Sequence, residues 1–116
     1  MDKRSSNRKK VNLHAEVILE SEYHLGFIEN ISEEGMFMRT APTAAAPSFS
    51  PGAVINLKVQ LPSGEDLNMR CRVVWSYKTP HEGLASRIIT PVPEYTAMGM
   101  QIIDAPAKYQ EFIATI

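Results

Sequence analysis

Two runs of alternating apolar and polar residues, joined by a turn-forming segment, constrain the fold more than any other feature. Every second residue is apolar from 55 to 61 and again from 67 to 75. Because successive side chains of a strand point to opposite faces, each run has one fully apolar face. Residues 62–66 between them contain proline, serine, glycine and aspartate, which favour tight turns. We therefore expect an antiparallel hairpin that buries one face.

Shorter runs of the same pattern predict further strands. Residues 13–19 alternate, 23–31 follow after a short turn as their hairpin partner, 36–40 form a short third strand, and 98–102 form a last one. The proline-rich segments 41–52 and 78–94 are interpreted as loops, the second of them long, with a strand or a helical turn within it as the alternative. About six short antiparallel strands with a closing helix predict an all-β fold, a small barrel, since closure removes exposed strand edges.

Near the C-terminus the apolar period changes to that of a helix. The residues that recur at i, i+3, i+4 and i+7 are Tyr109, Phe112, Ile113 and Ile116. We expect a terminal helix over 105–116, with Asp104 as its N-cap and Pro106 in its first turn. Its apolar face is expected to pack on the barrel, and a contact that makes a homodimer is the alternative.

Charge is distributed unevenly along the 116 residues, although the formal net charge is only -1. The first ten residues carry five basic side chains and one acidic one, a net charge of +4. Residues 11–116 carry the other 7 basic and 12 acidic side chains, a net charge of -5. We interpret 1–10 as a flexible basic arm and 11–116 as a single domain. The composition, 44% hydrophobic, excludes a fully disordered chain, and the length excludes a two-domain enzyme.

Several classes of protein lack their sequence signals here. The single cysteine, Cys71, allows no intrachain disulfide and fits a reducing cytoplasmic setting. No apolar run approaches the ~18–20 residues that span a bilayer, and no signal-peptide segment follows the basic arm. There is no phosphate-binding loop, dinucleotide-binding glycine pattern or zinc-spaced Cys/His set. We expect no cofactor, no metal, no membrane span and, without a nucleophile–base pair, no enzymatic activity.

Two short patterns are suited to binding an anion or a nucleobase. Arg4 and Arg8 lie four residues apart, so their guanidinium groups can close on one phosphate or bind the O6/N7 edge of guanine. Asn30 and Ser32 would share one face of a strand, with the residue between them pointing inward. Gly35 would permit the positive φ of a turn or a close ligand approach. A solvated basic tail and ordinary turn chemistry are the alternatives.

In this order and spacing the two patterns resemble those of the PilZ family of bacterial cyclic di-GMP receptor domains. That family has RxxxR before the first barrel strand and [D/N]xSxxG at the second and third strands, matched here by Arg4 and Arg8, then Asn30, Ser32 and Gly35. The resemblance covers essentially the whole chain. It implies a six-stranded antiparallel β-barrel with a C-terminal helix and an arm that folds over the ligand. It also implies that Lys3, just before the first arginine, influences ligand stoichiometry.

The remaining candidates are interpreted as structural. Cys71 and Trp75 fall on the apolar face of their strand, where core packing is expected, and a stacking surface at a sheet edge is the alternative for Trp75. Arg70 and Arg72 fall on the opposite face, an ordinary solvated strand face, with an extension of the binding face as the alternative. No Asp, Glu or Cys stands at metal-ligand spacing from the histidines, so neither metal binding nor catalysis is expected of His14, His24 and His81.

Together these features predict a cytoplasmic, non-catalytic cyclic di-GMP receptor or adaptor that signals to a partner protein the sequence does not identify. A PilZ-like interaction module without nucleotide binding is the alternative, because Glu33 and Glu34 place two negative charges near a doubly anionic ligand. A small barrel that binds single-stranded nucleic acid is the third hypothesis. It would need exposed aromatics on a basic face, and the body is acidic, so no nucleic-acid partner is expected.

Overall fold

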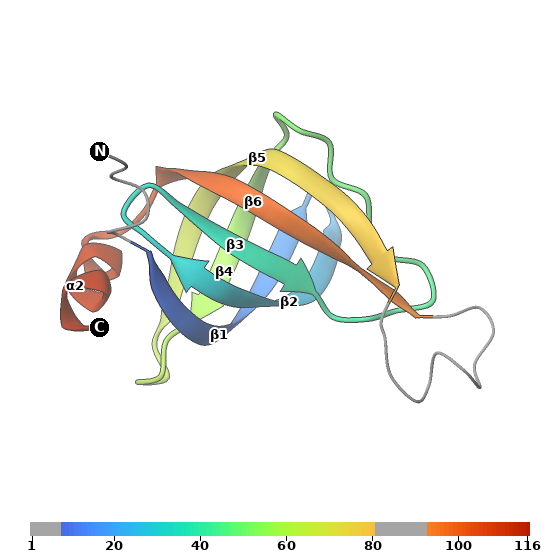
Figure 1. Cartoon of the computed structure of the whole chain (residues 1–116). Coiled ribbons are helices and arrows are strands. Elements are labelled where there is room, and N and C mark those ends of the chain that lie inside the picture. The colour runs from blue at the N-terminus through green and yellow to red at the C-terminus, as the bar shows by residue number, and fades with distance from the viewer. Residues whose placement is uncertain (1–7, 81–92) are drawn as a thin grey trace.

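Six antiparallel strands close into a barrel, as the alternating pattern predicts (Figure 1). The structure is a computed structural model that describes residues 8–80 and 93–116. Around the barrel the strands follow the order β1-β2-β3-β6-β5-β4. Their bounds are Lys9–Leu19 (β1), Glu22–Ile31 (β2), Gly35–Thr40 (β3), Val54–Gln60 (β4), Asp66–Pro80 (β5) and Glu94–Asp104 (β6). Because β1 begins at Lys9, the last two residues of the segment predicted as an arm lie in a strand.

The barrel core is formed by the apolar positions of the alternating runs. In the predicted hairpin β4–β5, Leu57 pairs with Met69 and Val59 with Leu67, and all four side chains are buried. On β1 the alternating positions 13, 15 and 17 are buried in the same way. Burying an aliphatic side chain of this size stabilises the fold by about 1.5–3 kcal/mol. The period-2 pattern therefore determines which face of each strand is inside.

The segment predicted as a long loop, 78–94, begins and ends as strand, which corrects that prediction. β5 continues to Pro80, and β6 begins at Glu94, with Lys78 paired to Thr96. The two strands run together past the others (Figure 1). Their ends there carry polar residues and a proline, so apolar alternation gives no signal. Residues 81–92 lie outside the described residues.

Trp75 is not in the core, contrary to the prediction. The pairing of β5 with β6 shifts register between Val73 and Trp75, so Val74 is an extra residue in β5. A bulge of this kind turns the following side chain to the other face. Val73 is buried, whereas 41% of Trp75 is exposed, and its ring lies on the outer surface against Gly99.

The C-terminal helix α2 covers Ala107–Thr115, shorter than the predicted 105–116. Its N-cap is Pro106, not Asp104, because Asp104 is still the last residue of β6. Tyr109 is buried, as expected of the helix stripe, and its hydroxyl donates a hydrogen bond of 2.7 Å to the carbonyl of Ser32. Phe112 and Ile113 pack against the core, and Ile116 is exposed. No helix in the described part of the chain is long and apolar enough to cross a membrane.

Candidate functional site

An irregularity in β2 turns two consecutive polar side chains to the outside of the barrel. Ile28 and Ile31 are both completely buried although they are three residues apart, which a regular strand does not allow. The pairing of β2 with β3 shifts register between Ile28 and Asn30, so Glu29 is the extra residue of a bulge. Glu29 and Asn30 therefore both lie on the outer surface.

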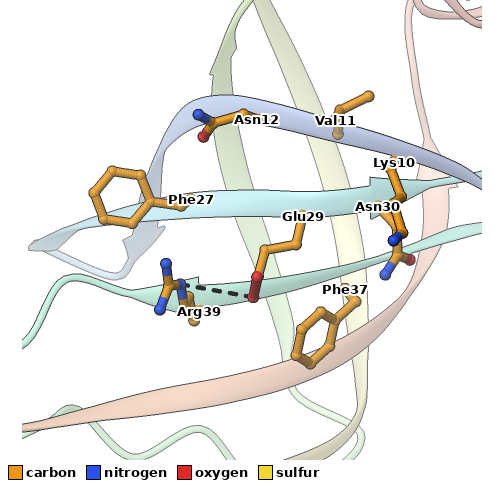
Figure 2. A pocket seen from close by; sticks show the side chains of 8 residues that line it. All are labelled: Lys10, Val11, Asn12, Phe27, Glu29, Asn30, Phe37 and Arg39. Atoms are coloured by element: carbon orange, nitrogen blue, oxygen red, sulfur yellow. Dashed lines mark ion pairs between the residues drawn. The ribbon is translucent and has the colours of Figure 1, made fainter. Parts of the chain in front are cut away.

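A second irregularity, in β1, faces the first. Lys10 pairs with Asn30 and Leu13 pairs with Ile28, so two residues of β1 lie opposite Glu29 alone. The two bulges adjoin a hollow of about 620 Å³ on the outer surface of β1, β2 and β3. Figure 2 shows the side chains that line it, which are Lys10, Val11, Asn12, Phe27, Glu29, Asn30, Phe37 and Arg39.

Arg39 and Glu29 form the polar centre of the hollow. Nε of Arg39 lies 3.6 Å from Oε1 of Glu29, the ion pair drawn in Figure 2. The guanidinium also lies 5.9 Å from the ring centre of Phe27 and 5.7 Å from that of Tyr95, within range of cation–π attraction. Lys10 adds a second positive charge to the lining, so the hollow is cationic by one charge and suits an anion.

Two of the residues predicted to bind ligand are in direct contact. Nη1 of Arg8, just before β1, donates a hydrogen bond to Oδ1 of Asn30, which lines the hollow. The contact places the second arginine of RxxxR at the rim of the hollow. Lys3 and Arg4 lie outside the described residues.

Ser32 and Gly35 have a different position: they build the turn between β2 and β3. The Ser32 hydroxyl accepts hydrogen bonds from the amides of Glu34 and Gly35, at 3.3 and 3.1 Å, so it is engaged in the turn. This is the turn chemistry offered as the alternative for these residues. Neither residue lines the hollow. Glu33 and Glu34 are exposed in the same turn.

Of the two roles expected for Gly35, a positive φ is not observed: in the described residues, the glycines with positive φ are Gly52 and Gly64. Gly35 is needed for close packing instead. A Cβ at position 35 would lie 2.5 Å from the carbonyl oxygen of Met100 on the neighbouring strand β6. The absence of a side chain therefore lets β3 approach β6.

Sequence reasoning missed the aromatic and charged side chains of the hollow. Phe37 and Arg39 occupy the outward positions of β3, where they alternate with the buried Met36, Met38 and Thr40. The sequence signal that could have identified this surface is Phe37 itself, a large apolar residue at an outward-facing position of a strand. Phe37, Trp75 and Tyr77 form a row of rings on the outer surface. The ring centre of Trp75 lies 5.5 Å from that of Phe37, and 5.6 Å from that of Tyr77, on which it stacks.

The other candidates have the surroundings of structural residues. Cys71 is buried, and burial raises the pKa of its thiol to about 12, which opposes a nucleophilic role. Arg70 and Arg72 are exposed as predicted, and neither lines the hollow. His14 contacts the ring of Phe27 edge-on. Within the described ranges no three His, Cys, Asp or Glu side chains are grouped to hold a metal.

A family model described as the PilZ domain matches residues 2–112. A comparison with curated proteins finds no match. Among solved structures, the chain is similar to the inhibitor of motility MotI/DgrA of Bacillus subtilis, with a TM-score of 0.67 and 17% identity over 97% of this chain and 48% of that one. The PilZ domain of YcgR from Escherichia coli, solved with c-di-GMP, gives 0.67 and 8% identity, covering 92% and 82%.

MrkH, described as a c-di-GMP-dependent transcription regulatory factor, gives a TM-score of 0.66 and 15% identity, over 93% of this chain and 46% of that one. The chain thus spans about half the length of MotI/DgrA and of MrkH. At these identities the three likenesses establish the fold.

Proposed function

The chain belongs to the PilZ domain family, which typically binds cyclic di-GMP, and from that membership we propose that it is a non-catalytic cyclic di-GMP receptor. The observation that supports this best is the contact between Arg8 and Asn30. These residues come from the two family patterns, 22 positions apart in sequence, and they meet at the rim of a cationic hollow. A ligand with two phosphates and two guanines matches that combination of charge, amide and aromatic surface.

In this proposal the arginines bind the anionic part of the ligand. Arg8 and Arg4 supply guanidinium groups, which bind phosphate through paired, charge-assisted hydrogen bonds. Asn30 supplies an amide beside them, and Ser32 and Gly35 act by holding the turn that places Asn30. Lys3 extends the basic arm and influences how many ligand molecules bind. Because the arm carries a net of +4 and the rest of the chain -5, binding depends on the arm and weakens with added salt.

The response in this proposal is an ordering of the arm over the ligand. Ordering remodels the surface around the hollow, which a cytoplasmic partner protein then recognises. The conformational entropy lost by the arm lowers the affinity below what the number of contacts suggests.

The test is isothermal titration calorimetry with cyclic di-GMP, read for both affinity and molar ratio. Each charge-assisted hydrogen bond contributes about 1.5–3 kcal/mol, so Arg8→Ala and Arg4→Ala are each expected to weaken binding by about 10- to 100-fold. Arg70→Ala is the matched control, because it removes an exposed arginine that does not line the hollow. Absence of binding by the unaltered protein, or an affinity in both arm variants equal to that of the unaltered protein, contradicts the proposal.

One observation favours a second candidate, a barrel that binds single-stranded nucleic acid. The outer-surface rings of Phe37, Trp75 and Tyr77 form the kind of row on which bases stack. The net charge of residues 11–116, -5, opposes it. Titration with a short oligonucleotide, followed by the fluorescence of Trp75, separates the two: tight oligonucleotide binding without cyclic di-GMP binding selects this candidate.

A further inference from the structure

The centre of the hollow carries a carboxylate between aromatic side chains, an arrangement that the PilZ patterns do not include. Glu29 lies on β2, with Phe27 two residues before it on the same strand and Phe37 on the neighbouring strand β3 (Figure 2). Side-chain exposure is 43% for both Glu29 and Arg39, so the carboxylate is reachable from solvent yet partly shielded. A negative group inside a site for a dianion is unfavourable unless it makes a specific contact.

Guanine offers that contact. Its Watson–Crick edge presents two neighbouring donors, N1–H and N2–H, and a carboxylate accepts from both because it is an acceptor with two oxygens. Adenine presents an unprotonated N1 at the same place, so a carboxylate there faces a lone pair. Proteins that hold a single base combine hydrogen bonds to its Watson–Crick edge with aromatic or apolar side chains against its faces. The hollow has both elements, in Glu29 and in the rings of Phe27 and Phe37.

We propose that Glu29 determines base specificity, by accepting hydrogen bonds from N1–H and N2–H of one guanine of the ligand. This inference rests on the proposed function, because it names the group that distinguishes guanine from adenine at the same site. The β2 bulge is what makes it feasible. Without the extra residue, Glu29 and Asn30 would point to opposite faces, and one of them would be buried in the barrel.

Arg39 acts as a positioning residue for Glu29. Its guanidinium lies over the rings of Phe27 and Tyr95, 5.9 and 5.7 Å from their centres, and its Nε lies 3.6 Å from the Glu29 carboxylate. In the described residues this Nε is buried and has no hydrogen-bond partner, so the ion pair with Glu29 is its polar contact. Arg39 thus orients the carboxylate and offsets its charge toward a dianionic ligand.

The experiment compares Glu29→Gln with Glu33→Gln by calorimetry, using cyclic di-GMP and its adenine counterpart, cyclic di-AMP. Both variants remove one negative charge, but Glu33 is exposed in the turn and does not line the hollow. Electrostatics alone would make both variants bind the dianion more tightly. Loss of a paired hydrogen bond to guanine instead weakens cyclic di-GMP binding by about tenfold or more in Glu29→Gln only, and reduces the preference over cyclic di-AMP.

The outcomes separate the two proposals. Binding by the unaltered protein, weakened by Arg8→Ala but unchanged or tightened by Glu29→Gln, overturns the role of Glu29 and leaves the receptor function standing. Absence of binding by the unaltered protein refutes the receptor function itself. Arg39→Lys keeps the charge but removes the planar guanidinium near the two rings, so it is expected to weaken cyclic di-GMP binding and to reduce the preference over cyclic di-AMP, both by less than Glu29→Gln does. Thermal unfolding of each variant, followed by Trp75 fluorescence, verifies that it is folded.

Discussion

Replacing Tyr109 with phenylalanine removes one hydroxyl group and tests how the helix is attached to the turn between β2 and β3. Only 2% of Tyr109 is exposed, and its hydroxyl donates to the Ser32 carbonyl at 2.7 Å, joining positions 77 apart in sequence. The change removes the donor of a buried hydrogen bond and leaves the carbonyl without that partner, a loss that in total costs about 1–3 kcal/mol and is usually near the lower end of that range for uncharged groups. We expect the free energy of unfolding to fall by about 1–2 kcal/mol.

The measurement is thermal and urea unfolding followed by the fluorescence of Trp75, the single tryptophan of the chain. An unfolding entropy of about 2.1 cal/mol/K per residue converts this loss into a midpoint lowered by about 4–8 °C for 116 residues. Tyr23→Phe is the control, because Tyr23 is 63% exposed and its midpoint is expected to stay within about 1 °C of the original. A Tyr109→Phe midpoint equal to that of the control would refute the role assigned to this hydrogen bond.

Three further changes test the packing around the site. Gly35→Ala places a Cβ against the Met100 carbonyl, a backbone atom that cannot rotate away, so a loss of about 1–3 kcal/mol is expected in urea unfolding; an unchanged midpoint contradicts this. A Cβ at position 99 would collide with Nε1 of Trp75, so Gly99→Ala displaces the indole ring from β6; the emission of Trp75 is expected to shift to longer wavelength without loss of the fold, and an unchanged emission contradicts this. Burial raises the pKa of Cys71 from 9.0 to about 12. The contribution of Cys71 to stability is therefore complete below pH 9 and is lost as pH rises from 9 to 12, and a thiol reagent at pH 8 should label Cys71 only after unfolding.

The inner faces of the strands were predictable, and the outer ones were predictable only between bulges. Alternation identified the buried positions of β1, β4 and most of β5, because in a regular strand every second side chain lies on the same face and the apolar face must be the buried one. A bulge adds a single residue and reverses the faces beyond it, and the residues at the bulges, such as Val74 and Glu29, carry no turn signal. Trp75 was assigned to the core for this reason. Phe37 and Arg39 were missed because the importance of an outward position depends on what the neighbouring strand places beside it.

The same bulges explain why the family pattern divides into contact residues and framework residues. Asn30 lies on the outer surface because Glu29 is inserted before it, and it touches Arg8. Ser32 and Gly35 are tied instead to the turn, to helix α2 through the Ser32 carbonyl, and to β6 through close packing. A binding defect in Ser32→Ala or Gly35→Ala can therefore arise from a displaced turn without any lost ligand contact. Asn30→Ala and Arg8→Ala leave the turn intact, so a binding defect with an unchanged unfolding midpoint in these two variants identifies groups that contact the ligand.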